Sequence, residues 1–289
     1  MSAPAVRVPG VWHTFLTAAR LGWKIESNWT DPFLFLVYSI LKPLSHAAIL
    51  VVMIMVVSGG RTEGALFNYI VIGNACYTWA TSVIVGVSFG VLDDRERYKT
   101  LKYLCLAPIP LPLYLIGRGA AQFLMGCIAV ALTLLLAALV FHLPIRPGEI
   151  RWGWLLASLL FGIVSLALIG LLVGGMTLLM AHQVEVVGYA VAGSLYLVSG
   201  AIFPLEVLPS WLRWIGYGLP LTWWLELTRR ALVGNAAAAS PSMAAFGDAS
   251  VLAILAGQTV VLAVVATLGW KWAYHRARER GLLDKVTNY

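Results

Sequence analysis

The stretch WGWLLASLLFGIVSLALIGLLVGGMTLLM at residues 152–180 decides the fold class, because no charged side chain interrupts it. A helix of about 20 apolar residues crosses the hydrocarbon core of a bilayer, and this run is longer. The 289-residue chain shares this character: 60% of its residues are hydrophobic, 11% are charged and the mean hydropathy is +0.84. Soluble domains carry about 25% charged residues. The composition therefore excludes a soluble enzyme, a disordered chain and a disulfide-stapled secreted domain, and it predicts an integral membrane protein.

Five other apolar runs have a length suited to a membrane helix, and none alternates polar and apolar residues as a strand would. We predict an all-α membrane protein with six transmembrane helices, at residues 33–57, 66–92, 113–141, 152–180, 186–203 and 250–272. Residues 1–32 precede this transmembrane domain (33–272), and residues 273–289 follow it as a basic tail.

Lysine and arginine are unevenly shared between the segments that join the predicted spans. If the N-terminus is cytoplasmic, 12 of them fall in inside segments and 6 in outside segments. Cytoplasmic loops are enriched in these residues, so both termini are predicted to be cytoplasmic. The basic tail directly follows a span and lacks a basic–aromatic platform. Lipid head groups or a cytoplasmic partner are therefore expected there, and nucleic acid is not.

The segment before the first span has the pattern of an amphipathic helix. Within residues 11–29, Trp12, Leu16, Ala19 and Trp23 recur at helical spacing, and polar residues take another face. This pattern predicts a helix that lies in the inner membrane interface. A frayed leader is the alternative.

The segment 204–247, before the last span, is predicted to lie outside and is too apolar for a free loop. It holds four tryptophans and two weakly amphipathic stretches, 210–218 and 222–233, each too short to cross a bilayer. We predict a re-entrant helical hairpin that dips into the outer leaflet. A hairpin that lies in the interface without a role in transport is the alternative.

The loop DDRERYKTLKYLCLAPIPLP at residues 93–112 is the most informative cytoplasmic segment. Its first half is densely charged and compatible with a helix, and its prolines end that helix and redirect the chain. A short charged helix between two spans can dock in a groove of another protein. A solvated loop that only carries positive-inside charges is the alternative.

Two groups of residues match short motifs. The first lies in the charged loop and the next span: ERYKTLK at 96–102, AP at 107–108 and LIGR at 115–118. The second lies around the hairpin: SGAIFP at 199–204, LP at 208–209, WL at 211–212, PLT at 220–222, Arg229 and Gly234. With the order of the predicted elements, they resemble the membrane subunit of ABC-2-type exporters, the group of nodulation-factor, polysaccharide and drug exporters. Lys99 stands where that family usually has Gly, and Lys102 where it usually has Glu.

The resemblance implies a permease in the cytoplasmic (inner) membrane of a prokaryote, which forms an export path with a second permease copy in a homodimer or a paired heterodimer. It also implies two copies of a separate ATPase subunit that hold ATP and Mg, because this chain has no GxxxxGK[ST] phosphate loop and no cofactor is expected in it. The coupling contact is expected at Asp94, Arg95, Glu96, Arg97, Thr100 and Lys102, with a second coupling turn at His182 and Glu185. Either Asp94 or Glu96 is the main acidic contact.

Charged side chains in membrane segments are costly, so each marks a candidate functional position. With one mid-span tryptophan, the candidates for lining the path or contacting lipid are Lys42, Trp79, Arg118, Glu226, Arg229 and Arg230. The alternatives are that Lys42 snorkels to the interface, that Arg118 binds a head-group phosphate or an acid, and that Trp79 packs against a neighbour. The histidines do not cluster with carboxylates, so no metal site is predicted.

Two other functions compete with an exporter permease. A membrane-embedded lipid or sugar transferase would need paired carboxylates or a His–Asp pair on one side, and the outside acids are scattered. An ion channel or proton-coupled carrier would bury titratable groups, and Asp and Glu are absent from the span interiors. No catalytic residue is therefore assigned. The aromatic hairpin and apolar spans favour an amphipathic, lipid-linked or glycolipid-like substrate for the exporter.

Overall fold

The structure is a computed structural model, and it describes residues 10–27, 64–140, 143–180, 184–234 and 240–283 with a few separate positions between 37 and 56. In order, the elements are α1 (Val11–Ser27), α3 (Ala65–Leu92), the π-helical turn η1 (Asp93–Arg97), α4 (Leu101–Leu106), α5 (Leu111–Val140), α6 (Trp152–Leu179), α7 (Val184–Val198), the 3₁₀ turn η2 (Leu205–Val207), α8 (Ser210–Gly218), α9 (Pro220–Val233), α10 (Pro241–Ala244) and α11 (Asp248–Glu279). These residues contain no strand, which confirms the all-α prediction for the part described.

Four helices are long and apolar enough to cross a bilayer: Ala65–Arg97, Leu111–Val140, Trp152–Leu179 and Asp248–Glu279. They coincide with four of the six predicted spans. The predicted first span, 33–57, lies mostly outside the described residues. The predicted fifth span, 186–203, corresponds to α7 and is shorter than expected, because the chain leaves the helix after Val198 and turns at Gly200 with a positive φ of 72°.

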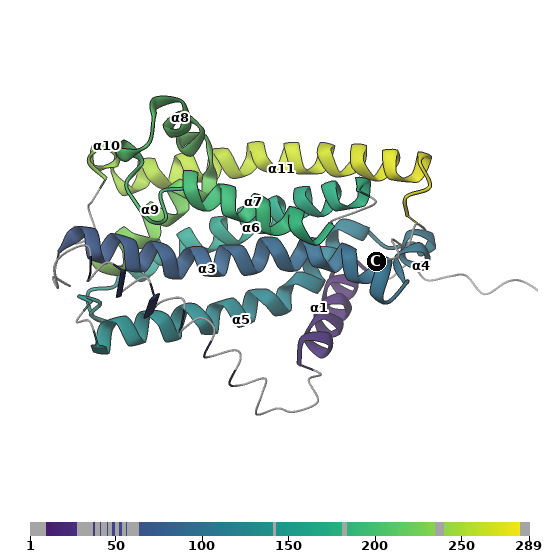
Figure 1. The fold of residues 1–289 in the computed structure, drawn as a ribbon, viewed down its shortest axis with the longest axis horizontal. Coiled ribbons are helices and arrows are strands. Elements are labelled where there is room, and N and C mark those ends of the chain that lie inside the picture. The colour runs from purple at the N-terminus through teal and green to yellow at the C-terminus, as the bar shows by residue number, and fades with distance from the viewer. Residues whose placement is uncertain are drawn as a thin grey trace, which may run out of the picture.

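The long helices lie side by side, and α3 is the central one (Figure 1). It packs against α5, α6, α7 and α9, and 67% of its most apolar window is buried. In α5 and α11 only 22% of that window is buried. The outer helices therefore present apolar side chains to their surroundings, which suits contact with lipid tails.

Small residues let the long helices approach closely, as is usual between membrane helices. Val87 of α3 lies between two glycines: a Cβ on Gly119 of α5 would be 2.6 Å from its Cγ2, and a Cβ on Gly170 of α6 would be 2.9 Å from its Cβ. Hydroxyl pairs add polar contacts, such as Ser165 to Thr259 (2.8 Å) between α6 and α11. The middle of the bundle is thus joined by packing and neutral hydrogen bonds.

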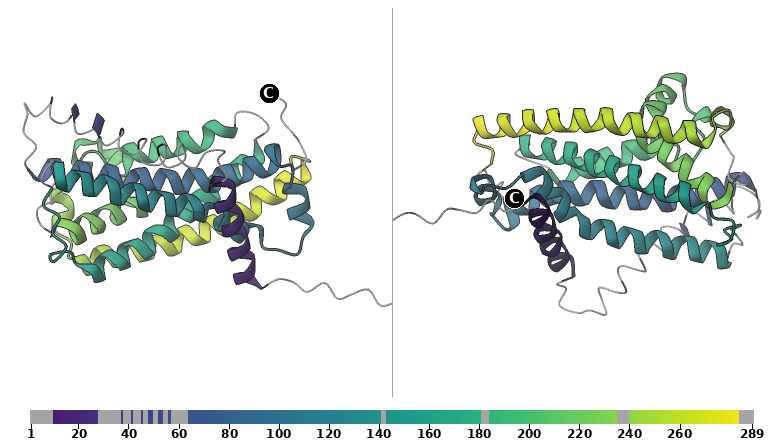
Figure 2. Two further views of the ribbon diagram at one scale, coloured as in Figure 1. Left: turned by 90° about the horizontal axis from the view of Figure 1, so that it is seen from below. Right: turned by 180° about the vertical axis from the view of Figure 1, so that it is seen from behind.

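Helix α1 crosses the bundle at one end instead of running along it (Figures 1 and 2). Its buried face is formed by Thr14, Ala18 and Gly22, and a Cβ on Gly22 would be 2.3 Å from a carbonyl oxygen of α5. Trp12 and Trp23 point away from the protein and are exposed. The predicted helix is therefore confirmed over Val11–Ser27, with Trp12 and Trp23 on the free face.

The two ends of the bundle hold different segments. The turn η1, α4 and the end of α11 lie at the end that α1 crosses, and α8, α9 and α10 gather at the opposite end (Figures 1 and 2). The predicted hairpin helices 210–218 and 222–233 correspond to α8 and α9. The charged loop and the hairpin thus lie as far apart as the long helices allow.

Candidate functional site

The charged segment after α3 continues that helix instead of forming a loop. In η1 the Tyr98 amide donates a hydrogen bond to the Asp93 carbonyl oxygen (2.8 Å). Lys99 then adopts a left-handed backbone with φ of 54°, and the chain reverses into α4. Glycine adopts a positive φ without steric cost, which gives a physical reason for the glycine of the resembled motif at this position.

A buried ion pair fixes η1 to α5. Arg118 donates to a carboxylate oxygen of Asp94 (2.6 Å) and to one of Asp93 (3.2 Å). The side chains of Arg118 and Asp94 are only 5% and 1% exposed. The Thr100 hydroxyl also lies 3.4 Å from the Asp94 carboxylate, and the Arg118 guanidinium lies 5.4 Å from the Tyr98 ring. Buried charges need such partners because their desolvation is costly.

Arg95 connects the same turn to the end of α6. Its guanidinium donates to the carbonyl oxygens of Thr177 (3.2 Å) and Met180 (2.9 Å), and it pairs with Glu96 (2.9 Å). A cation is favoured at this end of a helix, where free carbonyl groups leave a partial negative charge. Arg95 therefore caps α6 directly before the predicted second coupling turn.

The other residues predicted at the coupling contacts are placed as follows. Arg97 and Lys102 are exposed, and Thr100 is half-buried. Glu185 belongs to the first turn of α7, but its side chain lies outside the described residues, as does His182. The structure thus brings the two predicted coupling segments to one end of the bundle through Arg95.

Of the candidates for a path or lipid contact, Lys42 lies outside the described residues, and Trp79 is buried in the core. The Trp79 indole donates to the Phe123 carbonyl oxygen (3.2 Å), and its ring lies 5.1 Å from that of Phe123 and 5.7 Å from that of Trp224. Trp79 therefore joins α3 to α5 and α9.

Arg229 binds the backbone of the turn that follows α7. It is 2% exposed and donates to the carbonyl oxygens of Gly200 (2.9 Å), Ala201 (3.0 Å) and Tyr69 (3.2 Å). Its guanidinium stacks 3.5 Å from the centre of the Tyr69 ring, and the Tyr69 hydroxyl also donates to Gly200 (2.7 Å). A Cβ on Gly73 would be 2.0 Å from the guanidinium. Arg229 thus holds α3, α9 and the end of α7 together.

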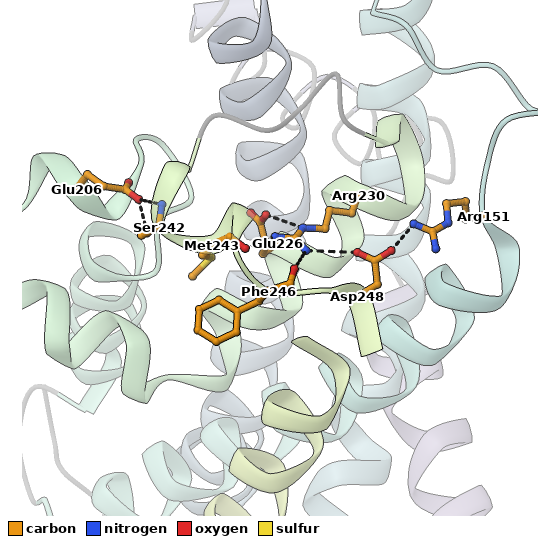
Figure 3. Close-up of polar contacts among 8 residues, drawn as sticks. All are labelled: Arg151, Glu206, Glu226, Arg230, Ser242, Met243, Phe246 and Asp248. Carbon is orange, nitrogen blue, oxygen red and sulfur yellow. Dashed lines mark hydrogen bonds and ion pairs between the residues drawn. The ribbon is translucent and has the colours of Figure 1, made fainter. Parts of the chain in front are cut away.

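A second charged group joins α6, α9 and α11 at the end of the bundle opposite η1 (Figure 3). Arg230 pairs with Glu226 (2.8 Å) and Asp248 (3.3 Å), and Asp248 also pairs with Arg151. Arg230 further donates to carbonyl oxygens around α10, including that of Phe246 (2.6 Å). Two arginines and two carboxylates therefore neutralise one another at this end.

Glu206 connects η2 to α10 (Figure 3). The amide and the hydroxyl of Ser242 both donate to one of its carboxylate oxygens, the amide at 2.9 Å. Partial burial opposes ionisation, but the hydrogen bonds from Ser242, a hydrogen bond from the Glu206 backbone and the charge of Arg213 together outweigh it. They hold the pKa of Glu206 below its ordinary value of 4.5. The contact therefore favours the ionised carboxylate.

Within the described ranges, no group of three or more His, Cys, Asp or Glu residues could hold a metal ion. The geometry offers two charged clusters at opposite ends of an apolar bundle. One contains Asp93, Asp94, Arg95, Glu96 and Arg118, and the other contains Arg151, Glu226, Arg230 and Asp248. The family model described as ABC-2 type transporter matches residues 17–233. The match includes most of α1, the charged residues around η1, the residues Arg151, Glu226 and Arg230 at the opposite end, and all the motifs quoted above except Gly234. The chain belongs to the ABC-2 type transporter family. A search of curated proteins finds no match.

This ABC-2 permease is therefore a multi-pass membrane protein that contributes the transmembrane part of an ABC transporter. Sequence reasoning did not assign a role to three residues that complete the two charged clusters: Asp93, Arg151 and Asp248. Opposite charges at the outer ends of the fourth and sixth predicted spans were a usable signal for Arg151 and Asp248. No sequence signal pointed to Tyr69, whose ring supports Arg229.

Proposed function

We propose that this permease moves an amphipathic, lipid-linked or glycolipid-like substrate out across the cytoplasmic membrane of a prokaryote. Two copies of a separate ATPase subunit, which bind ATP and Mg, power it, and a second permease copy completes the path. The family match supports the transporter, and the exposed tryptophans of the hairpin support an amphipathic substrate. Both termini are cytoplasmic in this proposal, and the segment 33–57 and α7 supply the remaining two spans.

In this proposal the ATPase acts on η1 and α4. The buried contacts of this segment support a lever: Asp94 ties it to α5, and Arg95 ties it to the end of α6. A push on the segment therefore moves the ends of three helices together. The holding residues are Asp94, Arg95, Glu96 and Thr100, and the contacting residues are Arg97 and Lys102.

At the outer end, we propose that α8 and α9 dip into the outer leaflet. Trp211 and Trp214 of α8 are 65% and 75% exposed, and such rings prefer the head-group level. The buried charges of α9 fit this depth because protein groups satisfy them: Glu226 pairs with Arg230, and Arg229 binds carbonyl oxygens. These residues hold the hairpin in place beside the path.

The partner is tested by affinity purification of the full-length tagged chain from its native membranes. An ATPase with a phosphate loop should co-purify, and candidate amphiphiles should stimulate its ATP hydrolysis in reconstituted vesicles. The double variant Arg146→Gln/Glu149→Gln, which alters an exposed pair at the opposite end, is the matched control and should retain the ATPase. Absence of any ATPase from the wild-type preparation would refute the proposal.

Orientation is tested with a thiol reagent that cannot cross the bilayer, in a variant whose three native cysteines are replaced by alanine. Lys99→Cys and Trp211→Cys place one exposed thiol at each end of the bundle. In intact cells Trp211→Cys should be labelled and Lys99→Cys only after lysis. Labelling of Lys99→Cys in intact cells would reverse the topology and remove the coupling assignment.

A further inference from the structure

Helix α11 is longer than a single crossing of the bilayer requires. Its 32 residues extend about 48 Å, whereas the hydrocarbon core of a bilayer is about 30 Å thick. One of its faces is apolar and open to the surroundings: Val261, Val265 and Leu268 are 64%, 50% and 61% exposed. Trp272 is 64% exposed and ends this apolar face, and tryptophan prefers the head-group level of a membrane. The last two turns of α11 therefore lie at the polar surface of the bilayer.

Cations lie on both flanks of the apolar face near Trp272. A helix turns by about 100° per residue, so Lys271 and Arg278 lie on one flank and Arg276 lies on the other. All three are exposed. Arg276 pairs with Glu279 (3.1 Å), whereas Lys271 and Arg278 form no ion pair with any residue that the structure describes. The flank with Lys271 and Arg278 therefore carries two positive charges that the described part of the protein does not neutralise.

Tyr274 lies between these two cations on the same flank, three residues after Lys271 and four before Arg278. It is half-buried at the contact with α4, where its hydroxyl is hydrogen-bonded to the Cys105 thiol. Side chains of a helix lean toward its N-terminus, so Arg278 leans back toward Tyr274 and the bilayer. A lysine such as Lys271 extends its ammonium toward the polar surface. The two cations therefore converge on the level of Tyr274, beside the wall that α4 forms.

We infer that this flank, formed by Lys271, Tyr274 and Arg278, binds the head group of an anionic phospholipid. The ammonium and guanidinium groups hold the phosphate, and the acyl chains lie along the apolar face of α11. Charge complementarity favours this occupant, because two cations at the head-group level adjoin a face suited to lipid tails. The inference goes beyond the proposed function. It requires only that α11 crosses the bilayer, and it needs neither the ATPase nor the transported substrate.

The test titrates the purified full-length permease, delipidated in a neutral detergent, with short-chain phosphatidylglycerol, and native mass spectrometry counts the bound lipid. Each cation near an anionic head group contributes about fivefold to binding, so Lys271→Gln/Arg278→Gln should weaken it about thirtyfold. The control Arg276→Gln/Arg280→Gln removes two exposed charges from the opposite flank of the same helix end and should bind like the wild type.

Two further measurements separate lipid binding from a folding defect. The variant Lys271→Arg/Arg278→Lys keeps both charges and should retain most of the binding. Because the substituted side chains are exposed, all three double variants should keep the wild-type melting temperature in lipid-free detergent.

Three outcomes would overturn the inference. Equal weakening in the two glutamine variants would mean that binding depends on total charge and not on this flank. Equal affinity of the wild type for phosphatidylglycerol and for neutral phosphatidylcholine would remove the preference for an anionic head group. Loss of a co-purifying protein from Lys271→Gln/Arg278→Gln, with lipid binding unchanged, would assign the flank to a protein partner. None of these results touches the proposed function, and failure of an ATPase to co-purify would leave the lipid titration unaffected.

Discussion

The buried pair between Asp94 and Arg118 yields the sharpest prediction for the stability of the end of the bundle that holds η1. Breaking a buried ion pair from one side costs about 3–5 kcal/mol. Asp94→Asn should cost less, about 2–3 kcal/mol, because Arg118 keeps Asp93 at 3.2 Å and an asparagine oxygen still accepts a hydrogen bond. In a chain of this size that corresponds to a melting temperature lower by about 4–8 °C.

The assay is thermal unfolding of the purified permease in detergent at neutral pH, followed by intrinsic tryptophan fluorescence. Arg118→Met should be more harmful than Asp94→Asn, because it leaves two carboxylates without their cation. Adding Asp94→Asn to Arg118→Met should restore part of the loss. The control Glu149→Gln breaks an exposed pair, with side chains 76% and 64% exposed, and should shift the midpoint by about 1 °C at most. A double variant that melts no higher than Arg118→Met would refute the reasoning.

Three further predictions use the same assay unless stated. Lys99→Gly should keep or slightly raise the melting temperature. Lys99→Val should lower it by about 3 °C, because a β-branched residue tolerates positive φ poorly. Equal melting temperatures of the two variants would contradict backbone strain at Lys99. Gly126→Ala should cost about 1–3 kcal/mol, since its Cβ would be 2.2 Å from the Trp79 ring, and Gly257→Ala, with nothing within 4 Å, should be neutral. Because the pKa of Glu206 is lowered, the stabilisation from its hydrogen bonds to Ser242 is fully present above pH 4.5 and is lost as the pH falls through the lower folded pKa. Amide hydrogen exchange at α10 should become faster over that pH range. Glu206→Gln should abolish the pH dependence of this exchange.

The long helices could be predicted from the sequence because a bilayer leaves few alternatives for an apolar run. Backbone groups in lipid must be satisfied internally, so length and hydropathy alone located α3, α5, α6 and α11 to within a few residues at most ends. The C-terminal end of α3 was the exception. Its charged residues 93–97 continue the helix as η1, because Arg118 of α5 neutralises Asp93 and Asp94. Arg95 of η1 itself is satisfied by carbonyl oxygens at the end of α6.

Partner choice within the charged segments could not be predicted. Arg118 pairs with residues 24 and 25 positions earlier, and several other acids and cations were available to each group. Only the crossing of α3 and α5 decides that Asp94 is buried and Lys99 exposed. The sequence did mark the positions of Lys99 and Arg229 through the resembled motifs. Their reasons, a left-handed turn and a cluster of free carbonyl oxygens, are properties of the backbone.

The distribution of strong contacts indicates which movements the bundle tolerates. Moving η1 away from α5 would leave the buried charges of Asp94 and Arg118 without their partners. Moving η1, α5 and the end of α6 together breaks neither this pair nor the cap by Arg95. Helix α6 then extends about 42 Å toward the opposite end, where the amide of Arg151 donates to the Ala231 carbonyl oxygen of α9 (3.0 Å). Between these ends, α6 meets its neighbours through small residues and hydroxyl pairs, which slide at lower cost than buried ion pairs break. The contacts therefore favour displacement of α6 as a rigid rod that carries both ends with it.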